Sequence, residues 1–168
     1  MWELRNDAVF GRIPQERYTE LIDFAWGVGS ETAEECLKKY QTNEPAELAE
    51  KLGLSILELE SGPAFSQIKV FSEYYSNLKR IILYNATIMD EYHKLVSNGF
   101  TAVKDFGAMR ELFIAHEIFH HLECHLIGLT SRKKIITTFK IGPLRISSGV
   151  RAMSEIGAHS FTKALLGI

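Results

Sequence analysis

Residues 115–123 have the sequence AHEIFHHLE, and the interpretation of the whole chain depends on this stretch. It holds the pattern H-E-x-x-H in a strongly apolar segment, with no proline or glycine between residues 109 and 127. Two histidines four residues apart on a helix lie about 40° apart around the axis and one turn apart along it. The imidazoles of His116 and His120 can therefore reach one metal ion, and Glu117 lies beside them to act on a water held there.

Length and composition favour one domain without a basic or membrane-spanning surface. The chain has 168 residues, of which 46% are hydrophobic, enough for one sizeable core. The net charge of -2 argues against direct nucleic-acid binding, which needs clustered Lys and Arg. Cys36 and Cys124 cannot form a disulfide framework. There is neither an N-terminal signal pattern nor an apolar run of roughly 18 residues, so we expect a soluble, cytoplasmic protein.

Hydrophobic periodicity divides the chain into a helical first third and a mixed remainder. In residues 1–53 we expect helices, with Gly27 and Gly29 ending the first and Gly53 ending the third. In residues 54–168 we expect a small sheet, the helix with the H-E-x-x-H pattern and a last helix. The predicted helices are 14–25, 30–40, 46–52, 88–98, 104–127 and 149–166; the predicted strands are 54–60, one beginning at Ile68, 80–85 and 135–141, with turns at 61–63 and 142–143.

These elements predict an α+β fold. Residues 1–168 form a mostly helical single domain, with a small three-stranded sheet packed on the H-E-x-x-H helix in a zincin-like arrangement. That helix is apolar on both sides, which is typical of a helix packed between layers.

A catalytic metal site needs a third protein ligand and an open position for water. The pattern H-E-x-x-H-x-x-G-x-x-H is excluded, because position 123 is Glu and position 126 is Leu. Glu123 lies on the ligand side of the same helix but nearly a full turn past His120, which makes it an awkward ligand. Glu155, 35 residues after His120, lies on a separate helix in surroundings otherwise without acidic residues, so its carboxylate calls for a partner. We favour Glu155 as the third ligand.

Two segments together resemble the ImmA/IrrE-type metallopeptidases. Residues 110–121, RELFIAHEIFHH, match that family's helix with the H-E-x-x-H pattern, and residues 155–166, EIGAHSFTKALL, match its later E-x-x-A-N-x-F-A segment. Residues 46–59 are similar as well, so the resemblance covers roughly residues 46–168. The chain departs from the pattern at His159, where the family usually has Asn.

The resemblance implies a zinc-dependent, gluzincin-like protease. His116, His120 and Glu155 would then bind Zn²⁺, and Glu117 would be the general base. The partner would be a protein or peptide substrate, with DNA-binding repressors as candidates because studied members of the family cleave them. Two alternatives stay open: a catalytically silent, zinc-containing sensor or protein-binding regulator, and a structural domain without metal.

Several further polar groups have ordinary structural interpretations beside functional ones. The pair His121 and His125 points away from His116 and is interpreted as ordinary histidines on a partly polar face rather than a second metal site. The basic run is interpreted as a solvated loop, with docking of an acidic protein substrate as the alternative. That run comprises Arg132, Lys133, Lys134, Lys140 and Arg145, and the candidates for stabilising an oxyanion are His159, Tyr84, Tyr92 and Arg151.

Overall fold

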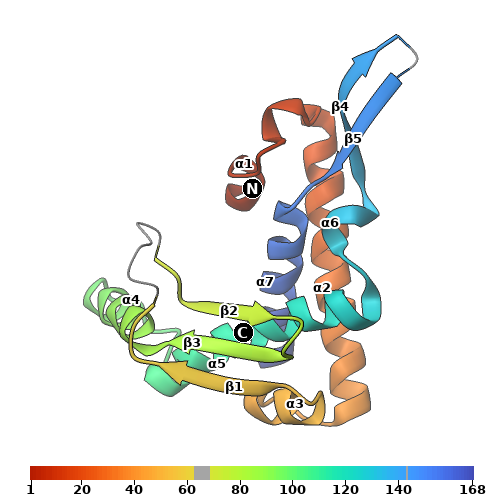
Figure 1. Ribbon diagram of the computed structural model, residues 1–168. Helices are drawn as coiled ribbons and strands as arrows, with labels where there is room; N and C mark the ends of the chain where they lie inside the picture. Colours follow the sequence, from red (N-terminus) through yellow and green to blue (C-terminus); the bar gives the residue numbers. More distant parts are fainter. Residues whose placement is uncertain (63–68, 143) are drawn as a thin grey trace.

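Three helices form the centre of the protein in the computed structural model, which describes residues 1–62, 69–142 and 144–168. They are α2 (Tyr18–Tyr40), α5 (Phe106–Leu122) and α7 (Ala152–Leu166). Helix α7 packs against both α2 and α5 (Figure 1). The larger of two hydrophobic clusters lies among these helices and the three-stranded sheet; its buried members include Ala33, Ile81, Leu83, Ile114, Ile118, Phe119 and Phe161.

Helix α2 is continuous, so the predicted stop at Gly27 and Gly29 is wrong. Gly29 lies where α2 crosses α7: a Cβ there would collide with the carbonyl oxygen of Gly157 and lie 2.8 Å from the Cβ of Ser160. At the same crossing, the Ser160 hydroxyl donates a hydrogen bond of 2.7 Å to the carbonyl oxygen of Trp26. Gly29 therefore serves close packing between two helices rather than helix termination.

The remaining helices are short or lie at the edges. Asp105 caps the N-terminus of α5, because its carboxylate accepts a hydrogen bond of 2.7 Å from the amide of Ala108. It continues beyond Leu122 as a π-helical turn, so the predicted helix over 104–127 is close to the observed one. The other helical elements are α1 (Trp2–Arg5), η1 (Phe10–Arg12), η2 (Gln15–Arg17), α3 (Pro45–Lys51), α4 (Asn85–Ser97), η3 (Glu123–Ile127) and α6 (Thr130–Lys133).

The three-stranded sheet is mixed and lies beside α5 (Figure 1). Its strands are β1 (Ser55–Leu59), β2 (Ser72–Tyr75) and β3 (Arg80–Tyr84), in the order β1-β3-β2. Strand β3 runs parallel to β1 and antiparallel to β2. In the described part, the second strand begins at Ser72, where its pairing with β3 starts. The predicted start at Ile68 and the predicted turn residue Pro63 lie outside the described residues. The tight connection over residues 76–79 sets this register by placing Tyr75 opposite Arg80.

In the sequence, a β-hairpin lies between α5 and α7, the two helices that carry the candidate ligands. Strand β4 (Ile135–Ile141) is confirmed, and it pairs with an unpredicted strand, β5 (Leu144–Gly149). The hairpin projects from the body in Figure 1, while its root joins the second hydrophobic cluster through Ile136 and Val150. Strand β5 ends two residues before α7 begins, so the hairpin root fixes where that helix starts. No helix in the described ranges combines the length and apolarity needed to span a bilayer.

Candidate metal centre

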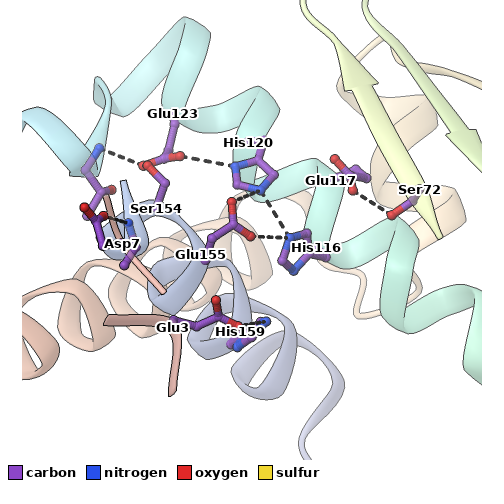
Figure 2. A network of polar contacts seen from close by, with 12 residues as sticks. Glu3, Asp7, Ser72, His116, Glu117, His120, Glu123, Ser154, Glu155 and His159 are labelled. Carbon is purple, nitrogen blue, oxygen red and sulfur yellow. Dashed lines mark hydrogen bonds and ion pairs between the residues drawn. The ribbon is translucent and has the colours of Figure 1, made fainter. Parts of the chain in front are cut away.

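The three predicted ligands meet between α5 and α7. His116 and His120 project from adjacent turns of α5, and Glu155 projects toward them from the first turn of α7 (Figure 2). The start of α7 is held by Asp7, whose carboxylate accepts a hydrogen bond of 2.8 Å from the amide of Ala152. A residue near the N-terminus thus fixes the helix that carries Glu155.

The distances among the ligand atoms fit one small metal ion. The Nε2 atoms of His116 and His120 are 3.2 Å apart. The Glu155 carboxylate lies 3.3 Å from the first of these atoms and 3.7 Å from the second. Metal–ligand bonds of about 2.0–2.1 Å in tetrahedral geometry place ligand atoms about 3.4 Å apart. These three residues could therefore hold a metal ion, as their mutual proximity indicates.

The centre is partly open to solvent. The exposed fraction of the side chain is 20% for His116, 21% for His120 and 44% for Glu155. The hydrogen bond from His116 outweighs burial and, with the charge of His120, holds the pKa of Glu155 at about 2. Glu155 is therefore an anionic donor throughout the neutral range.

The pKa of His120 is raised above its ordinary value. Burial lowers it, but the carboxylate of Glu123 and then that of Glu117 outweigh burial. Protons and a metal ion therefore compete for this imidazole, because a histidine must be neutral to bind a metal.

Glu117 is buried and lies beside the three ligands rather than among them. Its residue is 5% exposed, and its Oε1 accepts a hydrogen bond of 2.6 Å from the hydroxyl of Ser72 on β2. Glu117, His116 and Ser72 line one cavity of about 420 Å³. A carboxylate fixed by the sheet thus shares a cavity with a candidate ligand, as a general base requires.

A second cavity also adjoins His116. It has a volume of about 500 Å³ and is lined largely by apolar side chains, among them Leu112 and Phe113. His116, Phe113 and His159 line both cavities, so the two spaces adjoin along these three side chains.

Of the four candidates for stabilising an oxyanion, His159 is the one that the structure places in these cavities. Its ring centroid is 5.4 Å from that of His116, and its Nε2 is 3.9 Å from the Glu3 carboxylate. Burial and then the charge of His116 lower the pKa of His159. Tyr84, Tyr92 and Arg151 are not among the described residues that line the two cavities. Glu3, which lines the cavity of Glu117, was not predicted as a site residue, because the four-residue helix α1 is too short to give a periodic pattern.

Glu123 does not join the three ligands, in agreement with its predicted disadvantage. Its carboxylate is directed at the outer nitrogen of His120, with 3.3 Å between Glu123 Oε2 and His120 Nδ1. It also accepts hydrogen bonds from the amide of Thr130 and the hydroxyl of Ser154. No pattern in the sequence indicates these contacts, since Thr130 and Ser154 both follow the π-helical turn.

The histidine pair and the basic run singled out in the sequence do not bring together a second such donor set among the described residues. The imidazoles of His121 and His125 both contact the hydroxyl of Tyr74 instead of a carboxylate. In the basic run, Lys134 is already paired with Glu20 at 3.1 Å, whereas Arg132, Lys133 and Arg145 are exposed. The side chain of Lys140 lies outside the described part of the structure.

Comparisons with protein-family models, with curated proteins and with solved structures found no match for this chain.

Proposed function

We propose that this protein is a zinc-dependent peptidase that hydrolyses peptide bonds of a specific intracellular protein. The observation that carries the proposal is the convergence of His116, His120 and Glu155, with Glu117 in the cavity alongside. Two imidazole nitrogens and one carboxylate oxygen form a donor set used by catalytic zinc, and they leave a fourth position for water.

The residues of the chain divide the chemistry among them. Zinc, when bound, supplies a Lewis acid that polarises the scissile carbonyl and lowers the pKa of water to about 7. The Glu117 carboxylate accepts a proton from the attacking water as the new carbon–oxygen bond forms. It then delivers that proton to the leaving amine as the carbon–nitrogen bond breaks. The hydroxyl of Ser72 binds Oε1 of Glu117 and so fixes the orientation of the carboxylate.

Strand β2 supports a peptide as the substrate. Within the described ranges it pairs only with β3, and its other edge, unpaired among those residues, could take up an extended chain. Ser72 belongs to this strand and contacts Glu117, which places the strand next to the proposed base. A peptide added along β2 would pass the metal centre in a zincin-like arrangement.

The resemblance to ImmA/IrrE-type proteins supports a narrow choice of substrate. DNA-binding repressors are therefore the first candidates to be tested. His159, with its ring beside His116, is our candidate for donating a hydrogen bond to the developing oxyanion.

The proposal is tested by adding zinc to the purified protein and following cleavage of a peptide library by mass spectrometry. Glu117→Gln is expected to lower kcat on the order of 10²–10⁴-fold, because it removes the general base. It should retain zinc, since Glu117 is not a ligand. Cleavage that is unaffected in Glu117→Gln would contradict the proposal. Zinc binding without cleavage of peptides or repressors would favour the alternative of a silent sensor or regulator.

A further inference from the structure

The buried carboxylate of Glu123 contacts both helices that carry the candidate ligands, α5 through His120 and α7 through Ser154. Glu123 is 2% exposed and receives contacts from three different elements (Figure 2). Its Oε1 accepts hydrogen bonds from the amide of Thr130 in α6 at 2.7 Å and from the hydroxyl of Ser154 in α7 at 3.1 Å. Its Oε2 lies 3.3 Å from Nδ1 of His120 in α5.

We propose that Glu123 is a positioning residue that orients two of the three metal ligands at once. It holds the imidazole of His120 directly, and it holds the first turn of α7, from which Glu155 projects, through Ser154. This inference rests on the proposed metal centre and adds a residue outside its ligand set.

The contact with His120 determines which nitrogen of the ring can bind the metal. A carboxylate can only accept hydrogen bonds, whereas a neutral imidazole donates at one nitrogen and accepts at the other. The proton of His120 therefore lies on Nδ1, facing Glu123. The lone pair of Nε2 is then free on the side where Glu155 lies at 3.7 Å. Such carboxylate–histidine–metal arrangements fix the tautomer and raise the basicity of the ligand.

The contact with Ser154 extends this control to the third ligand. Ser154 immediately precedes Glu155 in the first turn of α7. Because Oε1 of Glu123 binds Ser154 while Oε2 faces His120, the separation of the two ligand-bearing helices is set at this carboxylate. Both oxygens are needed as acceptors. An amide offers a single acceptor oxygen, and its NH₂ group would face a donor on one of the two sides.

The test compares Glu123→Gln with Glu111→Gln in the full chain. Glu111→Gln is the matched control, since Glu111 lies on α5, which η3 continues, and its carboxylate accepts a hydrogen bond of 3.2 Å from the amide of Ala46, away from the ligands. Zinc affinity is measured by competition with a chromophoric chelator. The visible spectrum of bound Co²⁺ reports the coordination geometry, and thermal unfolding of the metal-free variants reports fold stability.

We expect Glu123→Gln to weaken zinc binding by about 10–100-fold and to change the Co²⁺ spectrum. Glu111→Gln should match the wild type in both. Ser154→Ala, which leaves the carboxylate and its contact with His120 in place, should weaken zinc binding about two- to five-fold. If Glu123→Gln does not fold, Ser154→Ala carries the comparison.

Zinc affinity and a Co²⁺ spectrum that equal those of the wild type, with only the unfolding temperature lowered, would overturn the inference by showing a purely structural carboxylate. For Ser154→Ala, unchanged zinc affinity would overturn the link to α7. Absence of zinc binding by the wild type would instead overturn the proposed metal centre itself. The two failures are therefore distinguishable.

Discussion

Two histidine pairs with the same spacing lie on opposite sides of one helical segment, and their surroundings differ. His116 and His120 have ring centroids 4.9 Å apart, and those of His121 and His125 are 4.8 Å apart. The first pair faces the Glu155 carboxylate on α7. The second pair faces Tyr74, whose hydroxyl lies 2.8 Å from His121 and 3.0 Å from His125.

The pKa values of His120 and His121, one from each pair, are shifted in opposite directions. Carboxylates raise the pKa of His120 despite its burial. Burial, followed by the charges of His125 and Lys79, lowers the pKa of His121 to about 4. Helical spacing brings two imidazoles together in both cases. The anionic group that a cation also requires comes from another element, and it is present on one side only among the described residues.

The largest difference is expected in metal binding. His116→Ala removes a ligand and should weaken zinc binding by more than about 100-fold, since even residues outside the ligand set commonly contribute 10–100-fold. The matched change on the other side, His121→Ala, should leave the affinity unchanged. Equilibrium dialysis followed by elemental analysis measures both. Equal losses in the two variants would contradict the assignment of the centre to the His116 side.

Acid unfolding of the metal-free protein should separate the two sides by pH. His121 has a pKa of about 4 in the folded state against 6.5 as its ordinary value. The stability that its neutral form contributes is complete above pH 6.5 and is lost as the pH falls toward 4. The loss is at most about 3.5 kcal/mol, since one pKa unit corresponds to about 1.4 kcal/mol.

The carboxyl of Glu155 follows the same rule in a lower window. Its pKa falls from 4.5 to about 2, so its contribution is complete above pH 4.5 and is lost toward pH 2. The free energy of unfolding, measured with urea across a pH series, should depend less on pH between 6.5 and 4 in His121→Asn. In Glu155→Gln it should depend less on pH between 4.5 and 2. If His121→Asn changed the lower pH range and Glu155→Gln the upper one, the surroundings assigned to these two residues would be contradicted.

Disturbing the packing of α7 against α2 should affect the side of His116 and His120 and leave the side of His121 and His125 unchanged. Gly29→Ala forces a Cβ against the backbone of Gly157, two residues after Glu155, and should cost about 1–3 kcal/mol of stability while weakening zinc binding. Gly27→Ala is the control in the same helix, because nothing lies within 4 Å of its Cβ position. It should stabilise the protein by about 0.5–1 kcal/mol. Similar unfolding temperatures for the two variants would refute the close helix crossing.

The smallest effect is expected from Tyr74→Phe. The change removes the hydroxyl that contacts His121 and His125, which should cost about 1 kcal/mol. Zinc affinity should not change, because Tyr74 lies on the other side of α5. A drop in zinc affinity comparable to that of His116→Ala would place the metal near Tyr74.

The sequence was sufficient where a feature depends on local periodicity. It predicted α5, the shared face of His116 and His120, and a separate helix bearing Glu155, because a period of 3.6 residues fixes directions around a helix. It failed at Gly29, where packing against α7 overrides the local tendency of glycine to end a helix.

Contacts between distant elements could not be predicted from the same patterns. Ser72 reaches Glu117 only because β2 pairs with β3 in a register set by the turn between them. Glu123 was considered as a ligand, but it contacts the outer nitrogen of His120, and its two other partners, Thr130 and Ser154, come from elements beyond the π-helical turn. No periodic signal in the chain specifies which donors will surround a buried carboxylate.

The most direct test is a crystal structure of the zinc-loaded protein with the metal located by anomalous scattering. We predict one ion bound by Nε2 of His116, Nε2 of His120 and the carboxylate of Glu155, with Glu117 beside it and not coordinated. An ion held by His121 and His125, or a Glu155 carboxylate beyond bonding distance of the ion, would contradict the proposed centre.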